Sequence, residues 1–148
     1  MRELEQLSMD IIDDDGATPL GLASRNGHVD VVKLLLNANA NIEAADNICG
    51  RTPLSWFAEK GHVDMVKLLL NANANIETAD KYGQTPLSWA AENGQLDVVK
   101  LLLNANANIE AADNQYGQTP LSRAAANRHV DVVKLLLNAN ANIYATRQ

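Results

Sequence analysis

The sequence predicts an all-α solenoid, in which short helix-turn-helix units are stacked in a row. A ten-residue phrase, Lys33 to Ile42, recurs unchanged three times, and a Thr-Pro-Leu phrase recurs at the same spacing. The copies of the longer phrase begin at Lys33, Lys67, Lys100 and Lys134, which are 34, 33 and 34 residues apart. Self-similarity at a period of about 20–50 residues is typical of arrays whose units bury their cores against one another.

Four full repeats are expected after a short N-terminal segment. The expected bounds are residues 1–12 for a capping helix or remnant repeat, then 13–45, 46–79, 80–112 and 113–148 for the repeats. In the first segment Leu4 and Leu7 lie at helical spacing, which predicts a helix from Arg2 to Leu7. Its outer side is polar, as a terminal cap requires.

Each repeat opens with Asp and Gly a few residues apart, a combination that favours a turn. Thr-Pro-Leu follows, with Thr suited to cap a helix and Pro to its first position. We expect a short first helix, as from Pro86 to Asn93, which ends at Gly94 in left-handed geometry. Gly27 and Gly61 occupy the same position, but Arg128 replaces them in the last repeat. Strain is expected there, because a left-handed L-residue is costly.

A second helix is predicted over Val29 to Asn37 and its equivalents. Among its first eight residues only Asp30 and Lys33 are polar, so we expect burial on most sides and a narrow solvent stripe. The helix should end at Asn39 in left-handed geometry, since Asn is the next best residue there after Gly. Ile42 should then pack under the next repeat. The same holds for the equivalents Asn73, Asn106 and Asn140, and for Ile76, Ile109 and Ile143.

The segment from Asp80 to Gly94, continued through Val98 to Leu103, resembles the ankyrin repeat. The resemblance covers residues 13–148 and implies stacked helix-turn-helix units with projecting hairpin-like loops. It also implies a binding function without catalysis, exerted through the loops and the first helices. The family's His after Thr-Pro-Leu is here replaced by Gly21, Ser55, Ser88 and Ser122. The near-identity of the repeats fits a fragment of a longer array or an engineered scaffold as well as a complete natural protein.

Composition argues against several other classes of function. The net charge of −6 disfavours nucleic acid as a partner. Cys49 is the only cysteine, so no disulfide framework exists and a reducing compartment, cytoplasmic or nuclear, fits. No apolar run reaches membrane-spanning length. We expect no cofactor, metal site or enzymatic activity, because the three histidines recur at one position per repeat, about 10 Å apart in packed helices.

We expect another protein to bind the concave face that the loops and first helices form. The candidate contact residues are Ile48, Arg51, Trp56, Tyr82, Gln84, Trp89, Tyr116 and Gln118. Tyr, Trp and Arg dominate the residues that contribute most to protein interfaces. The alternative is that Trp56 and Trp89 belong to the core, and this interpretation is slightly favoured because an isolated large apolar residue is usually buried. The alternative function is a structural spacer, or a designed scaffold without a ligand of its own.

The two ends of the array differ in charge. Residues 1–49 contain 3 basic and 9 acidic residues, whereas residues 114–148 contain 4 basic and 1 acidic. The last second helix repeats the internal apolar pattern at Val132, Val133, Leu136 and Leu137. We expect nothing to cover these residues, and therefore either fraying of this uncapped C-terminal repeat or weak self-association through it. In the second case the basic end of one copy could meet the acidic end of another.

Overall fold

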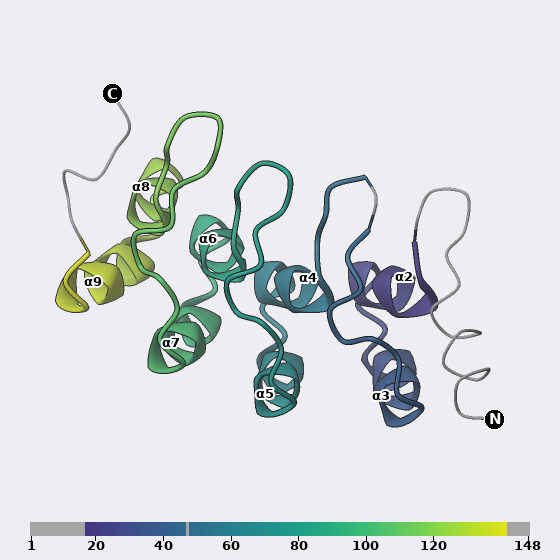
Figure 1. Cartoon of the computed structure of the whole chain (residues 1–148). Helices are drawn as coiled ribbons and strands as arrows, with labels where there is room; N and C mark the ends of the chain where they lie inside the picture. Colours follow the sequence, from purple (N-terminus) through teal and green to yellow (C-terminus); the bar gives the residue numbers. More distant parts are fainter. Residues whose placement is uncertain (1–16, 47, 142–148) are drawn as a thin grey trace.

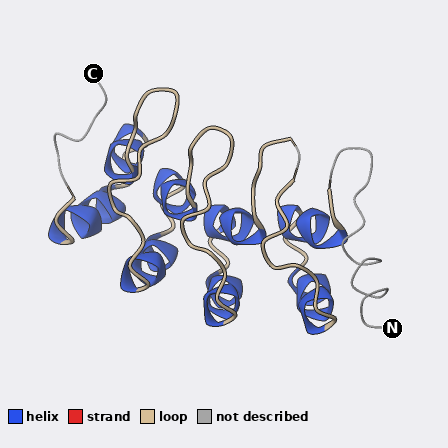
Figure 2. Ribbon diagram, viewed as in Figure 1, coloured by secondary structure: helices blue, strands red, loops and turns tan. Residues whose placement is uncertain are grey.

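The computed structural model describes residues 17–46 and 48–141, and all regular structure within them is helical (Figure 2). The first helices of the four repeats are α2 (Pro19–Arg25), α4 (Pro53–Lys60), α6 (Pro86–Glu92) and α8 (Pro120–Ala126). The second helices are α3 (Val29–Asn37), α5 (Val63–Asn71), α7 (Leu96–Asn104) and α9 (Val130–Asn138). The predicted N-terminal helix and Ile143 lie outside the described residues.

The helices form two parallel rows (Figure 1). In one row α2 packs on α4, α4 on α6 and α6 on α8; in the other α5 packs on α7 and α7 on α9. The described loops project beside the row of first helices, and the row of helices bends toward that side (Figure 1). That side of the stack is therefore concave, and we call the loops and first helices together the concave face.

The Thr-Pro-Leu phrase begins each first helix as predicted. Thr18 Oγ1 accepts a hydrogen bond from the Gly21 N–H at 2.9 Å, which satisfies one exposed donor of the helix end. The other three Thr residues cap in the same way, with Pro at the first helical position. The Leu that follows is buried in every repeat and lines the core: Leu20, Leu54, Leu87 and Leu121.

Left-handed residues end both helices of each repeat, again as predicted. Asn39, Asn73, Asn106 and Asn140 have φ between 64° and 69°. The first helices end at Gly27, Gly61, Gly94 and Arg128, with φ of 72°, 74°, 70° and 60°. Gly94 is required for two reasons: its φ is positive, and a Cβ added there would lie 2.6 Å from His129 Nδ1 of the next repeat.

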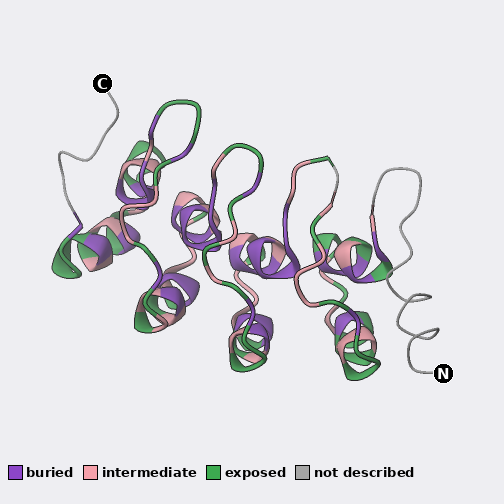
Figure 3. Ribbon diagram, viewed as in Figure 1, coloured by how far each residue is buried: buried purple, intermediate pink, exposed green. Residues whose placement is uncertain are grey.

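The expected burial of the second helices on most sides is confirmed for α5 and α7, where every apolar side chain is buried or half-buried and only the Asp, the Lys and the final Asn are exposed. Their buried parts face the first helices and their exposed parts face outward (Figure 3). The expectation is wrong for α3, in which only Val32 is buried and Leu34 is 69% exposed, because among the described helices α3 packs closely only on α2. The exposed polar stripe is confirmed at Asp30 and Lys33. Ile42 packs against the core, partly buried, as do Ile76 and Ile109.

The last second helix also differs from the expectation. Val132 and Leu136 were expected to lie uncovered at the end of the array, but they are buried at 1% and 0% exposure. They belong to the core cluster, in a helix that packs on both α8 and α7. Leu137 does lie exposed, at 42%. Self-association through this repeat remains a prediction.

Candidate functional site

In the third and fourth repeats the side chain of an aspartate accepts hydrogen bonds from backbone N–H groups of its own loop. Asp80 Oδ1 accepts hydrogen bonds from the backbone N–H groups of Tyr82 at 2.9 Å and Gln84 at 3.0 Å. Asp113 Oδ1 accepts from the three successive N–H groups of residues 115–117. Because these loop donors are satisfied from within, the tips have a defined shape before any partner arrives.

Neighbouring loops are also joined to each other. The Lys81 N–H donates to the Cys49 carbonyl at 2.8 Å, and the Asn114 N–H donates to the Tyr82 carbonyl at 2.8 Å. These two bonds link the loops of repeats two, three and four through main-chain atoms alone. The loops of these three repeats are therefore connected to one another along one edge of the molecule.

Arg51 lies between two indole rings beneath this edge. Its guanidinium carbon is 3.6 Å from the ring centroid of Trp56 and 3.8 Å from that of Trp89. Arg51 Nη1 forms an ion pair with Glu59 Oε1 at 2.7 Å, and Nε donates to Ser55 Oγ at 2.9 Å. Stacking and paired donors are both favourable for a planar cation. Arg51 thus fixes the two tryptophans to each other.

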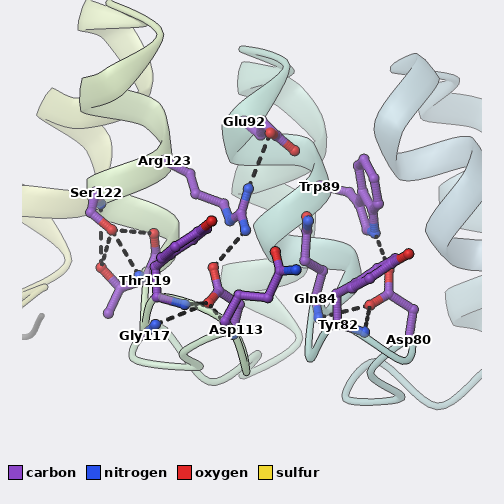
Figure 4. A network of polar contacts seen from close by, with 12 residues as sticks. Asp80, Tyr82, Gln84, Trp89, Glu92, Asp113, Gly117, Thr119, Ser122 and Arg123 are labelled. Atoms are coloured by element: carbon purple, nitrogen blue, oxygen red, sulfur yellow. Dashed lines mark hydrogen bonds and ion pairs between the residues drawn. The ribbon is translucent and has the colours of Figure 1, made fainter. Parts of the chain in front are cut away.

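The third and fourth repeats use a related contact between the first helix and its own loop (Figure 4). Trp89 Nε1 donates to Asp80 Oδ2 at 3.1 Å. Arg123 stands in the position of Trp89 one repeat on, and its Nη2 pairs with Asp113 Oδ2 at 2.5 Å. Its Nη1 also pairs with Glu92 Oε1 of the preceding repeat, at 3.1 Å. The residue at this position therefore ties the loop of the third repeat and that of the fourth to the row of first helices.

Burial and pairing shift two of these pKa values. Burial lowers the pKa of Arg51, against the opposing effect of Glu59 and Asp80, and the group stays charged. Burial alone would raise the pKa of Asp113, but the Tyr116 N–H and the Arg123 guanidinium bring it below its ordinary value. Both sites are accordingly internal ion pairs at neutral pH.

The eight candidate residues fall into three groups by exposure. Three lie exposed at the loop tips: Ile48, Tyr82 and Tyr116. Three are half-buried on the concave face: Trp56, Trp89 and Gln118. Two are buried at the loop bases, at 5% and 8% exposure: Arg51 and Gln84. The expectation that the Arg51 side chain offers contact area at a loop is thus corrected, because the side chain turns inward between the indoles.

A hollow of about 380 Å³ brings most of these residues together. Its lining consists of Cys49, Arg51, Trp56, Asp80, Tyr82, Gln84, Trp89 and Gln115. A smaller hollow of about 100 Å³ lies beside it and shares Cys49 and Trp56. Leu22 and Ile48 line the smaller one. Of the candidates, Tyr116 and Gln118 lie outside both.

Several residues that position the site were missed from the sequence. Glu92 and Arg123 form the bridge between repeats, and Glu43 Oε2 accepts the Asn75 N–H of the next repeat at 2.7 Å. Glu77 makes the equivalent contact at 2.7 Å. The recurrence of Glu after Asn-Ile in three repeats was the available signal, but a local pattern does not identify a partner more than thirty residues away.

The repeated His position has a structural role. His129 Nε2 lies 2.8 Å from the Glu92 carbonyl, and Gln95 Nε2 donates to the Glu59 carbonyl at 2.9 Å. Each side chain therefore joins the end of the preceding first helix. Across residues 17–46 and 48–141 no group of three or more His, Cys, Asp or Glu could hold a metal ion. In the same part of the chain no helix is long and apolar enough to cross a membrane.

Comparison with protein families supports this architecture. A family model of ankyrin repeats in three copies matches residues 39–113, which is half of the chain. The single ankyrin-repeat model matches residues 15–47 and 116–147. A search of curated proteins finds no match to the chain.

Proposed function

Because the chain belongs to the ankyrin-repeat family, whose repeats generally serve as protein–protein interaction modules, we propose that it binds a partner protein on its concave face. The observation that supports this most strongly is the pair of exposed aromatic tips. Tyr82 is 38% and Tyr116 is 69% exposed, on loops that main-chain hydrogen bonds hold in place. Rigid, exposed tyrosines supply contact area at little entropic cost.

The distribution of sequence differences among repeats supports the same face. The second helices repeat an exposed Asp and Lys in every unit, as at Asp64 and Lys67 of α5. The loop tips differ from unit to unit, with Ile48-Cys49, Lys81-Tyr82 and Gln115-Tyr116 at equivalent positions. A surface that recognises a particular partner needs such differences, whereas a spacer has no use for them.

The test is affinity capture from a lysate, followed by titration of each captured protein against purified variants. We expect Tyr82→Ala and Tyr116→Ala to cost about 2 kcal/mol each in binding, or about thirtyfold in affinity. Stability should be nearly unchanged, because both side chains are exposed. The matched control exchanges Asp64 and Lys67 on α5, and it should leave binding as it is.

Two results contradict the proposal. Loss of the partner on exchange of Asp64 and Lys67, with no effect of the tyrosine changes, would place binding on the second helices. If no protein is captured saturably, the spacer or scaffold function becomes the better account of the chain.

A further inference from the structure

The larger hollow on the concave face contains two charged residues, and both are paired within the chain. Arg51 pairs with Glu59 and stacks on Trp56 and Trp89. Asp80 accepts the indole N–H of Trp89 and two backbone N–H groups. A charged side chain entering this space would lose hydration without gaining a free counter-charge, which is unfavourable. The charge pattern therefore selects an uncharged occupant.

One polar group in the hollow is not paired. Gln84 is only 8% exposed and lines the hollow, yet its Oε1 is buried without a hydrogen-bond partner. Its backbone N–H and carbonyl are both used, the first by Asp80 Oδ1 and the second by the Asp80 N–H. A buried carbonyl without a donor is unfavourable in the free protein, and a donor brought by a ligand would relieve that cost.

Apolar and aromatic side chains form part of the walls of both hollows. Trp89 and Tyr82 line the larger hollow, and Trp56 lies in both. The smaller hollow is lined by Leu22 and Ile48, and also by the charged Arg25 and Asp46. The larger volume, about 380 Å³, falls in the range of about 300–1,000 Å³ that is usual for ligand pockets. Consecutive hollows along an edge suit an elongated occupant better than a compact one.

We propose that the concave face takes an extended peptide segment of the partner that is uncharged where it enters the larger hollow. The segment places an apolar side chain against Trp89 and Tyr82 there, and one main-chain N–H donates to Gln84 Oε1 once the buried amide turns toward the hollow. A peptide group suits this position, because it offers a neutral donor along an extended chain. This inference rests on the proposed function, since it names the chemistry of the partner for the same face.

The test uses the full chain and a phage-displayed library of short random peptides as the probe. Selected peptides are then synthesised and titrated. The chain has 2 tryptophans, both in the lining, so tryptophan emission reports occupancy of the hollow directly. Gln84→Met keeps an unbranched side chain of similar size but removes the amide. Lys100→Met, exposed on α7, is the matched control.

We expect the selected peptides to be uncharged over their binding core, to contain apolar side chains and to change the tryptophan emission. Gln84→Met should weaken binding about tenfold and raise the melting temperature, because an unpaired buried carbonyl is replaced by an apolar group. Lys100→Met should change neither. A purely structural Gln84 would show the opposite, with a lower melting temperature and unchanged affinity for the peptides.

The outcomes separate this inference from the proposed function. Three results would each overturn the inference: selected peptides that are charged over their binding core, tryptophan emission that does not change on binding, or a Gln84→Met variant that binds the peptides as tightly as the parent. If those peptides are still lost with Tyr82→Ala, the concave face remains the binding face. If no peptide binds, or if Tyr82→Ala has no effect on any of them, the inference fails, and the proposed function is decided separately by the capture and titration of whole proteins.

Discussion

Replacing Arg51 by Gln should lower the free energy of unfolding substantially, although Gln is the natural residue at this position in the next two repeats. Arg51 is 5% exposed and stacks on two indoles, and each such contact is worth about 1 kcal/mol where water is excluded. Its hydrogen bonds and ion pair add about 1.5–3 kcal/mol. The desolvation of the guanidinium offsets part of this. We expect a net loss of about 2 kcal/mol.

The free energy of unfolding is measured by urea unfolding and the midpoint temperature by thermal melting, both followed by far-ultraviolet circular dichroism. Fluorescence is unsuitable, because Arg51 touches both tryptophans and its removal alters their emission in the folded state. The midpoint temperature should fall by about 4–8 °C, given about 2–4 °C per kcal/mol in a chain of this size. Lys60→Gln, which replaces an exposed cation at the C-terminal end of α4, is the control and should stay within about 0.5 kcal/mol of the parent.

A double-mutant cycle isolates the ion pair from the stacking. Glu59→Gln alone leaves the Arg51 guanidinium without its carboxylate, while the double variant removes both charges. We expect a coupling energy of about 1 kcal/mol, since Glu59 is 30% exposed and the pair is partly screened. If Arg51→Gln is as stable as the parent, the stacked guanidinium does not hold the two tryptophans together and the account of this site is wrong.

Four other predictions concern the stability of the repeats and the self-association of the chain. Arg128→Gly should raise the melting midpoint by about 2–4 °C, because it relieves left-handed strain at φ 60°; an unchanged or lower midpoint would contradict this. Gly94→Ala should cost about 2–3 kcal/mol in urea unfolding, since its Cβ would meet His129; a neutral result would mean that His129 moves freely. Asp113→Asn should destabilise the chain at neutral pH. The native pKa of Asp113 is depressed, so its contribution is complete above about pH 4 and is lost as the pH falls through the native pKa. Melting curves of both proteins should therefore converge on acidification, and a constant gap would exclude this cause. Sedimentation across salt concentrations tests the self-association of the last repeat, which a salt-independent monomer would exclude.

The sequence by itself determined the local frame of the protein. Thr18 and its equivalents cap helices, Asn39 and its equivalents end them, and Arg128 adopts the left-handed geometry expected of its position. These features depend on φ preferences and on hydrogen bonds within a few residues, so a repeated phrase specifies them wherever it occurs. The exposed tips Tyr82 and Tyr116 were predictable for the same reason, because they lie at turns.

Only the tertiary structure decided which residues of the concave face are available to a partner. Gln84 and Gln118 occupy the same position before Thr-Pro-Leu, yet Gln84 is buried and Gln118 is half-buried. Arg51 occupies that position too and is held inward by Trp89 of the next repeat. Burial is set by side chains about thirty to forty residues away, across the interface between repeats. A pattern that repeats along the chain describes one unit at a time, whereas the site is formed by the differences between adjacent units once they are stacked.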